Sequence, residues 1–222
     1  MSEIDDVDEI DEYAGDHEEE QAYATSPGTH LTFFETIDED LAAYRRFLEF
    51  HDKNFKAFSI NLARIYLSVG SEVDVVAKMI AQRDGGLTKK QANMDDYRKI
   101  ISNQYPYLSY FRVRIRPMQL IIQPWENWLS DMNPQWWKDY NGVKHHREKR
   151  FFKANLDNVL YSSAGLLVLL AFWYGEFVQN RRVKLKFNVL EVDQSVDRWI
   201  VSGMFRSKTL PSAPGSPLSP TS

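Results

Sequence analysis

The longest helical pattern of apolar residues runs from residue 52 to residue 82. Within it, apolar side chains follow one another in steps of three or four: Phe55, Phe58, Leu62, Ile65, Val69, Val73, Val76 and Ile80. This spacing puts them on one face of a helix, for which Asp52 is a suitable N-cap. The pair Gly85-Gly86 predicts the end of the helix, because glycine readily adopts the left-handed conformation that closes helices.

Weaker helical patterns flank the long one. Residues 38–48 precede it, with Thr36 or Asp38 as the cap, and residues 88–101 follow it. A further helix is expected from Asn133, because Asn is a favourable N-cap and Pro follows it at the first helical position.

The most apolar stretch of the chain is 159–175, a run of 17 uncharged residues within a helix expected over 153–178. A run of this length is near the lower limit for a membrane span. It contains two serines, however, and Glu176 follows it directly. We therefore expect a buried core helix rather than a membrane span.

The pattern changes between residues 110 and 122. Apolar residues and arginines alternate up to Ile115, which is typical of a half-exposed strand, and a second short apolar run ends at Ile122. We expect a small β-hairpin or an extended excursion between helices. Three arginines would share one strand face, which is either an ordinary solvated face or a phosphate contact: Arg112, Arg114 and Arg116. A similar alternation predicts a short strand or extended strap within 181–201.

The two ends of the chain differ in composition from the middle. Residues 1–20 contain eleven acidic residues and no Lys or Arg, and the C-terminal end is rich in Ser and Pro. We predict a disordered acidic tail over 1–29, one helical domain over 30–206 and a disordered Ser/Pro-rich tail over 207–222. The expected fold is mainly α: an up-and-down helical bundle with a small β excursion.

Without its acidic tail, the rest of the chain carries a net positive charge. Outside residues 1–20 the chain has 27 basic and 20 acidic residues, a net charge of +7. A basic body can bind nucleic acid, with the acidic tail competing for the same surface. Alternatively, the tail only keeps the protein soluble.

Several classes of chemistry have no support in the sequence. There is no cysteine, which excludes disulfides, thiolate metal sites and cysteine nucleophiles. We find no phosphate-binding glycine loop, dinucleotide fingerprint, nucleophile-elbow serine or metalloprotease helix motif. We therefore expect no cofactor. The lack of cysteine and of a basic, apolar leader is typical of a cytoplasmic protein without membrane contact.

The candidate chemistry lies in the segment YNGVKHHREKR, residues 140–150. On a helix, Asn141 and His145 are four residues apart and share a face, where an amide and an imidazole can contact a phosphate or a 2′-hydroxyl. Positive charge nearby would bind RNA phosphates, and its sources are Lys144, His146, Arg147, Lys149 and Arg150. Alternatively, His145 bonds a neighbouring helix and the basic residues form a solvated face.

This segment resembles the polar motif of HEPN domains, which consists of Arg, a polar residue that is often Asn, a short spacer and His. Asn141 and His145 match the motif, whereas Tyr140 occupies the position of its Arg. The following ANLDNVLYSSAGLLVLL and the earlier SVGSEVDVVAKMI also resemble helices of the family. The likeness extends roughly over residues 38–178.

The resemblance implies an all-α bundle that forms a homodimer, with RNA or a nucleotide as partner. It also implies metal-independent ribonuclease activity, in a toxin or antiviral defence role, with His145 transferring the proton and Asn141 orienting the substrate. Tyr140 cannot supply the permanent charge of Arg. The alternative is a non-catalytic dimerisation or protein-interaction module, in which four tryptophans form core or interface: Trp125, Trp128, Trp136 and Trp137.

Overall fold

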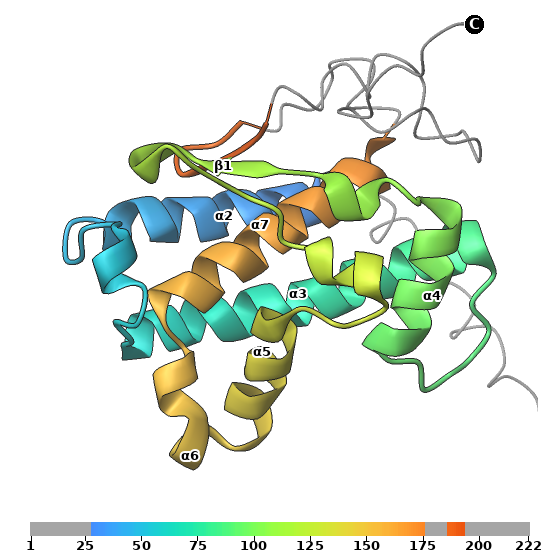
Figure 1. Cartoon of the computed structure of the whole chain (residues 1–222), viewed down its shortest axis with the longest axis horizontal. Helices are drawn as coiled ribbons and strands as arrows, with labels where there is room; N and C mark the ends of the chain where they lie inside the picture. Colours follow the sequence, from blue (N-terminus) through green and yellow to red (C-terminus); the bar gives the residue numbers. More distant parts are fainter. Residues whose placement is uncertain (1–27, 176–185, 194–222) are drawn as a thin grey trace, which may run out of the picture.

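The computed structural model describes residues 28–175 and 186–193 (Figure 1). Within these ranges the protein is mainly helical, as predicted, and it also has a three-stranded antiparallel sheet. The predictions for residues 1–27, 176–185 and 194–222 lie outside the described residues. They include almost all of both expected tails, the last turn of the core helix and most of the second basic alternation.

The central helix is α3 (Ile60–Gly85). It ends as predicted, with Gly86 in the left-handed conformation at φ 64°. The predicted start at Asp52 is wrong, because residues 52–54 form a separate 3₁₀ turn, η1 (Asp52–Asn54), and Ser59 caps α3. Between the two, the chain pairs with the segment before α7, as in the bridge between Phe58 and Asn155.

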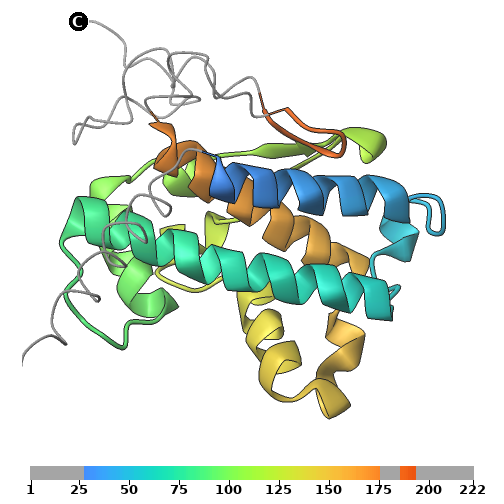
Figure 2. The same cartoon turned by 180° about the vertical axis from the view of Figure 1, so that it is seen from behind.

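Two helices lie along α3, α2 (Thr29–Tyr44) and α7 (Leu156–Trp173), with α2 antiparallel to it (Figures 1 and 2). By length and composition α7 is apolar enough to cross a membrane, but 83% of this stretch is buried inside the protein. The packing of α7 against α3 forms the centre of the core. This confirms the prediction of a buried core helix.

The first predicted helix begins earlier than expected, and Asp38 is not its cap. Asp38 lies in the middle of α2 and is 1% exposed. Its carboxylate accepts hydrogen bonds from the backbone N–H groups of Asn188 at 2.6 Å, Val189 at 3.0 Å and Leu190 at 3.1 Å. The partners of Asp38 are thus some 150 residues distant in sequence, which no local capping signal reveals.

The predicted hairpin is present. Strand β1 (Val113–Ile115) pairs with β2 (Leu120–Ile122), and the 3₁₀ turn η3 (Arg116–Met118) joins them. A third strand, β3 (Leu190–Val192), pairs with the other edge of β1, so the order is β2-β1-β3. The sheet lies along α7 at the top of Figure 1.

Helix α4 (Met94–Gln104) packs against α3 and begins at Asn93, which forms a capping box, rather than at Thr88. The predicted cap Asn133 is also wrong by one position, because Pro134 occupies the N-cap of α5 (Gln135–His145).

The side chain of Asn133 serves α4 instead of α5. It accepts a hydrogen bond from the buried Arg98 at 2.9 Å and donates one to Asp95 at 3.0 Å. Arg98 also binds Asp131, so this cluster joins α4 to the loop before α5.

The four tryptophans belong to the protein's own core, with exposed fractions of 0–7%. The indole of Trp125 donates to the carbonyl of Gly165 at 3.0 Å, and that of Trp136 donates to the carbonyl of Pro124 at 2.9 Å. Two further 3₁₀ turns complete this region: η2 (Leu108–Tyr110) and η4 (Glu126–Ser130).

Candidate nucleic-acid interface and a neighbouring pocket

The predicted site residues lie where α5 meets the short helix α6 (Arg147–Arg150). The chain bends at His146, with φ −138° and ψ 46°, and these two helices project from the body in Figures 1 and 2. The turn η5 (Phe151–Lys153) leads back to α7. Six exposed side chains form what we call the basic tip: Lys144, His145, His146, Arg147, Lys149 and Arg150.

Side chains of the basic tip form no hydrogen bond or ion pair with any part of the chain that the structure describes. Two of them contact their neighbours in other ways: the Lys144 ammonium lies 5.8 Å from the ring centre of Tyr140, and the stem of Arg150 lies over Gly142. Their positive charges therefore face solvent, with Glu148 as the one acidic residue between them.

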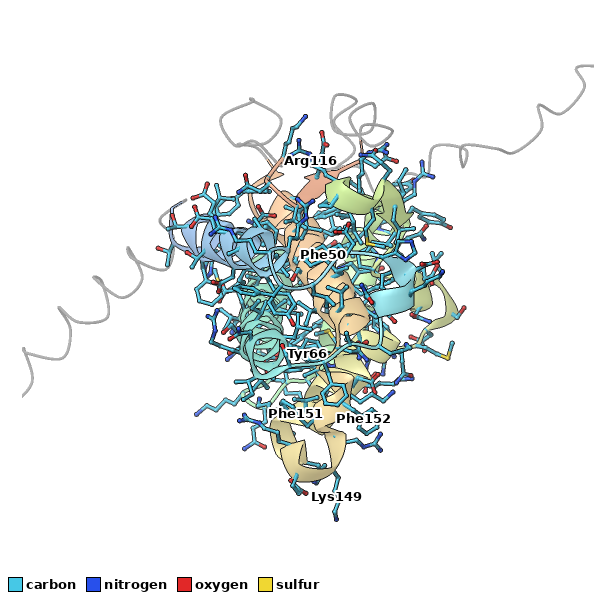
Figure 3. The ribbon with its side chains drawn as sticks, turned by 90° about the vertical axis from the view of Figure 1, so that its left-hand side faces the viewer. Phe50, Tyr66, Arg116, Lys149, Phe151 and Phe152 are labelled. Atoms are coloured by element: carbon cyan, nitrogen blue, oxygen red, sulfur yellow. The ribbon has the colours of Figure 1, made fainter. Side chains whose placement is uncertain are left out.

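The three arginines in and next to β1, in contrast, have acidic partners. Arg112 and Arg114 lie 3.3 Å and 3.5 Å from the carboxylate of Asp193, and Arg116 lies 3.8 Å from that of Glu191. Lys149 and Arg116 mark opposite ends of the molecule in Figure 3. Because these arginines share the carboxylates of Asp193 and Glu191, their face is partly neutralised, and the basic tip is the better candidate for contact with phosphate.

Asn141 and His145 both belong to α5 and lie four residues apart in it. His145 is the last residue of α5 and is exposed, and it bonds no neighbouring helix among the described elements. Asn141 is half-buried, and its amide nitrogen donates to the carbonyl of Trp137 at 3.0 Å. The amide oxygen of Asn141 and the imidazole of His145 both remain available to a ligand.

Tyr140 points away from this surface. It is 2% exposed, and its ring lies so close to Gly70 of α3 that a Cβ there would be 2.2 Å from the ring. It also contacts Tyr66 edge-on, with ring centres 5.9 Å apart. Burial, and then the charge of Asp74, raise the pKa of Tyr140 to about 12, so it is a neutral phenol. Tyr140 is a packing residue that joins α5 to α3.

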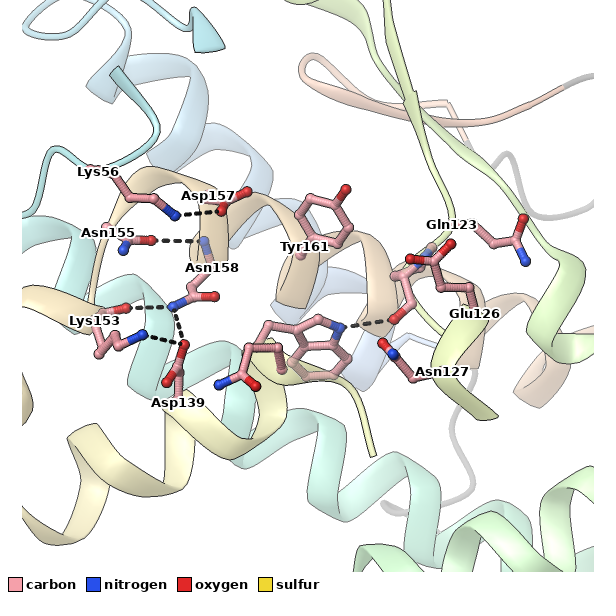
Figure 4. A pocket seen from close by; sticks show the side chains of 13 residues that line it. Lys56, Gln123, Glu126, Asn127, Asp139, Lys153, Asn155, Asp157, Asn158 and Tyr161 are labelled. Atoms are coloured by element: carbon pink, nitrogen blue, oxygen red, sulfur yellow. Dashed lines mark hydrogen bonds and ion pairs between the residues drawn. The ribbon is translucent and has the colours of Figure 1, made fainter. Parts of the chain in front are cut away.

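Next to these helices the structure contains a polar pocket of about 380 Å³ (Figure 4). Its floor includes Asp139, which is 7% exposed. Asp139 Oδ2 accepts from the Lys153 ammonium at 3.2 Å and from the Asn158 amide at 3.2 Å. Asn155 caps α7 beside them by accepting from the backbone N–H of Asn158 at 3.0 Å.

The sequence gives little sign of this pocket. The spacing of Asn155 and Asn158 is readable as a cap, but Asp139 and Lys153 come together only because α5 and η5 fold back on each other. Neither segment contains a local sequence pattern that predicts this contact.

Comparison with protein-family models, curated proteins and solved structures finds no match to this chain. The resemblance to HEPN domains therefore depends on the residues of the segment itself.

Proposed function

We propose that this protein binds RNA through the basic tip. The observation that carries the proposal is the group of exposed cations at residues 144–150, whose side chains form no hydrogen bond or ion pair with the described residues. Cations that no ion pair holds are free to contact phosphate, and each such contact releases a counterion from the nucleic acid. The histidines add charge when protonated and hydrogen-bonding capacity when neutral.

A second candidate function is metal-independent cleavage of RNA at the same surface. It is favoured by the free imidazole of His145 and the free amide oxygen of Asn141, one helical turn apart. His145 would take the proton of a 2′-hydroxyl as that oxygen attacks the adjacent phosphorus, and the 5′-oxygen would leave with a proton taken from water. Since Tyr140 is buried, Lys144 or Arg147 would stabilise the charge of the transition state.

Binding is tested by charge reversal. Arg147→Glu combined with Lys149→Glu should weaken binding of a labelled single-stranded RNA by about tenfold or more at low salt, and should flatten the dependence of log K on log salt. The matched control is Lys90→Glu with Lys99→Glu, which makes the same charge change at exposed positions in and before α4. Equal losses in both double variants would contradict a specific role for the tip.

Cleavage is tested with His145→Ala in the same RNA assay, with product length as the readout. If the second candidate holds, the variant should lose cleavage by at least about a hundredfold, the usual contribution of a general base, and should keep its affinity for RNA. Equal degradation by the wild type and the variant would remove His145 from the mechanism. Sedimentation of the same samples measures the homodimer that the HEPN resemblance implies.

A further inference from the structure

The polar pocket of Figure 4 has hydrogen-bonding groups that the fold does not use. Asp139 receives both of its hydrogen bonds at Oδ2, which leaves Oδ1 without a partner in the described chain. The amide oxygen of Asn158 accepts no hydrogen bond either. Both residues are more than nine-tenths buried, and these two oxygens are acceptors that a molecule in the pocket can use.

Donors stand beside these acceptors. The Lys153 ammonium bonds Asp139 at 3.2 Å and has further N–H groups to offer. The hydroxyl of Tyr161, half-buried in the pocket wall, has no partner among the residues that the structure describes. Hydrogen-bond donors and acceptors thus both line this pocket.

The charge of the pocket disfavours an anion. Two lysines line it, and each is paired with a carboxylate, Lys153 with Asp139 and Lys56 with Asp157 at 3.2 Å. A third carboxylate, that of Glu126, is exposed in the wall and unpaired within the described residues. Neither of the lysines that line the pocket is therefore unpaired and free to bind a phosphate, in contrast to the cations of the basic tip.

We propose that this pocket binds a neutral, hydroxyl-rich molecule of monosaccharide size. A hydroxyl both donates and accepts, so one hydroxyl of a vicinal pair can donate to Asp139 Oδ1 while its neighbour accepts from Lys153. A volume of about 380 Å³ lies at the small end of the range of roughly 300–1,000 Å³ for ligand pockets. The proposal does not depend on RNA binding, because the tip residues do not line the pocket.

The test is ligand-observed NMR on the full chain with five separate probes: D-glucose, D-ribose, myo-inositol, inorganic phosphate and putrescine. At least one of the three neutral polyols should bind saturably. Asp139→Asn should weaken that binding by about tenfold or more, since a hydrogen bond to a charged carboxylate is stronger than one to a neutral amide. Tyr161→Phe, which removes one hydroxyl from a partly exposed ring, should weaken it by about two- to tenfold.

Tyr110→Phe is the matched control, because Tyr110 is 44% exposed and does not line the pocket. It should leave polyol affinity unchanged, as should the Arg147 and Lys149 reversals. Saturable binding of phosphate or putrescine alone, or of no probe, would overturn the proposal. So would polyol binding that Tyr161→Phe leaves intact, a result that stands even if Asp139→Asn fails to fold.

Discussion

Gly70 and Tyr140 form a close contact between α3 and α5, and the absence of a side chain at residue 70 makes it possible. A Cβ at Gly70 would meet two ring atoms of Tyr140 at 2.2 Å, which is far inside van der Waals contact. An aromatic ring in a packed core cannot be displaced without moving the side chains around it. Tyr140 is thereby committed to packing in this chain.

Gly70→Ala should lower the free energy of unfolding by about 1–3 kcal/mol, because overpacking outweighs the gain in helix propensity. Urea denaturation followed by circular dichroism measures it. Gly142→Ala in α5 is the matched control, since its Cβ would find its nearest atom, in Arg150, at 3.5 Å. That variant should be neutral or more stable by up to about 1 kcal/mol. Similar destabilisation in both variants would show that the Tyr140 contact is not the cause.

At the scale of elements, one carboxylate joins β3 to α2. Asp38 of α2 accepts all three of the successive backbone N–H groups that lead into β3. Burial raises the pKa of the Asp38 carboxyl, although the same three donors lower it. Sheet formation on this edge thus depends on a helix that the chain completes about 145 residues earlier.

Asp38→Ala should destabilise the protein by about 2–4 kcal/mol, because several buried N–H groups lose their acceptor at once. Amide hydrogen exchange should accelerate first at residues 188–190. Asp40→Ala, two positions along α2, removes only an exposed ion pair with Arg64 at 2.9 Å and should cost less than about 1 kcal/mol. Unchanged exchange at residues 188–190 in Asp38→Ala would contradict the anchoring role.

At the scale of the whole molecule, buried phenols connect several helices and couple stability to alkaline pH. Burial raises the pKa of three tyrosines from 10.0 to about 12: Tyr97, Tyr105 and Tyr140. The folded state therefore keeps protons that the unfolded state loses. The resulting stability is fully present below pH 10 and is lost as the pH rises from 10 towards 12.

We expect unfolding above pH 10 in which far-ultraviolet circular dichroism and part of the tyrosinate absorbance change together. Tyr140→Phe, which keeps the ring and removes the ionisable hydroxyl, should shift this transition to higher pH. Complete tyrosine ionisation near pH 10 with the helices intact would contradict the coupling.

The local sequence was sufficient to predict the face of α3, its end at Gly86, the core helix α7 and the hairpin of β1 and β2. Hydrophobic periodicity and the conformational freedom of glycine depend on residues close together in the chain, so the sequence alone reveals them. The group of basic residues at 144–150 could be predicted for the same reason, because these residues are close together in the sequence.

Only the tertiary structure decided where α2 begins, which strand joins β1, and that Tyr140 faces α3 while His145 faces solvent. It also decided that Arg112 and Arg114 lie near the carboxylate of Asp193, and that Asp139, Lys153 and Asn158 line a pocket. These features depend on contacts between residues distant along the chain. Such contacts produce no periodic pattern in the sequence. Each partner, taken alone, is indistinguishable from any other polar residue, so the sequence does not predict the pairing.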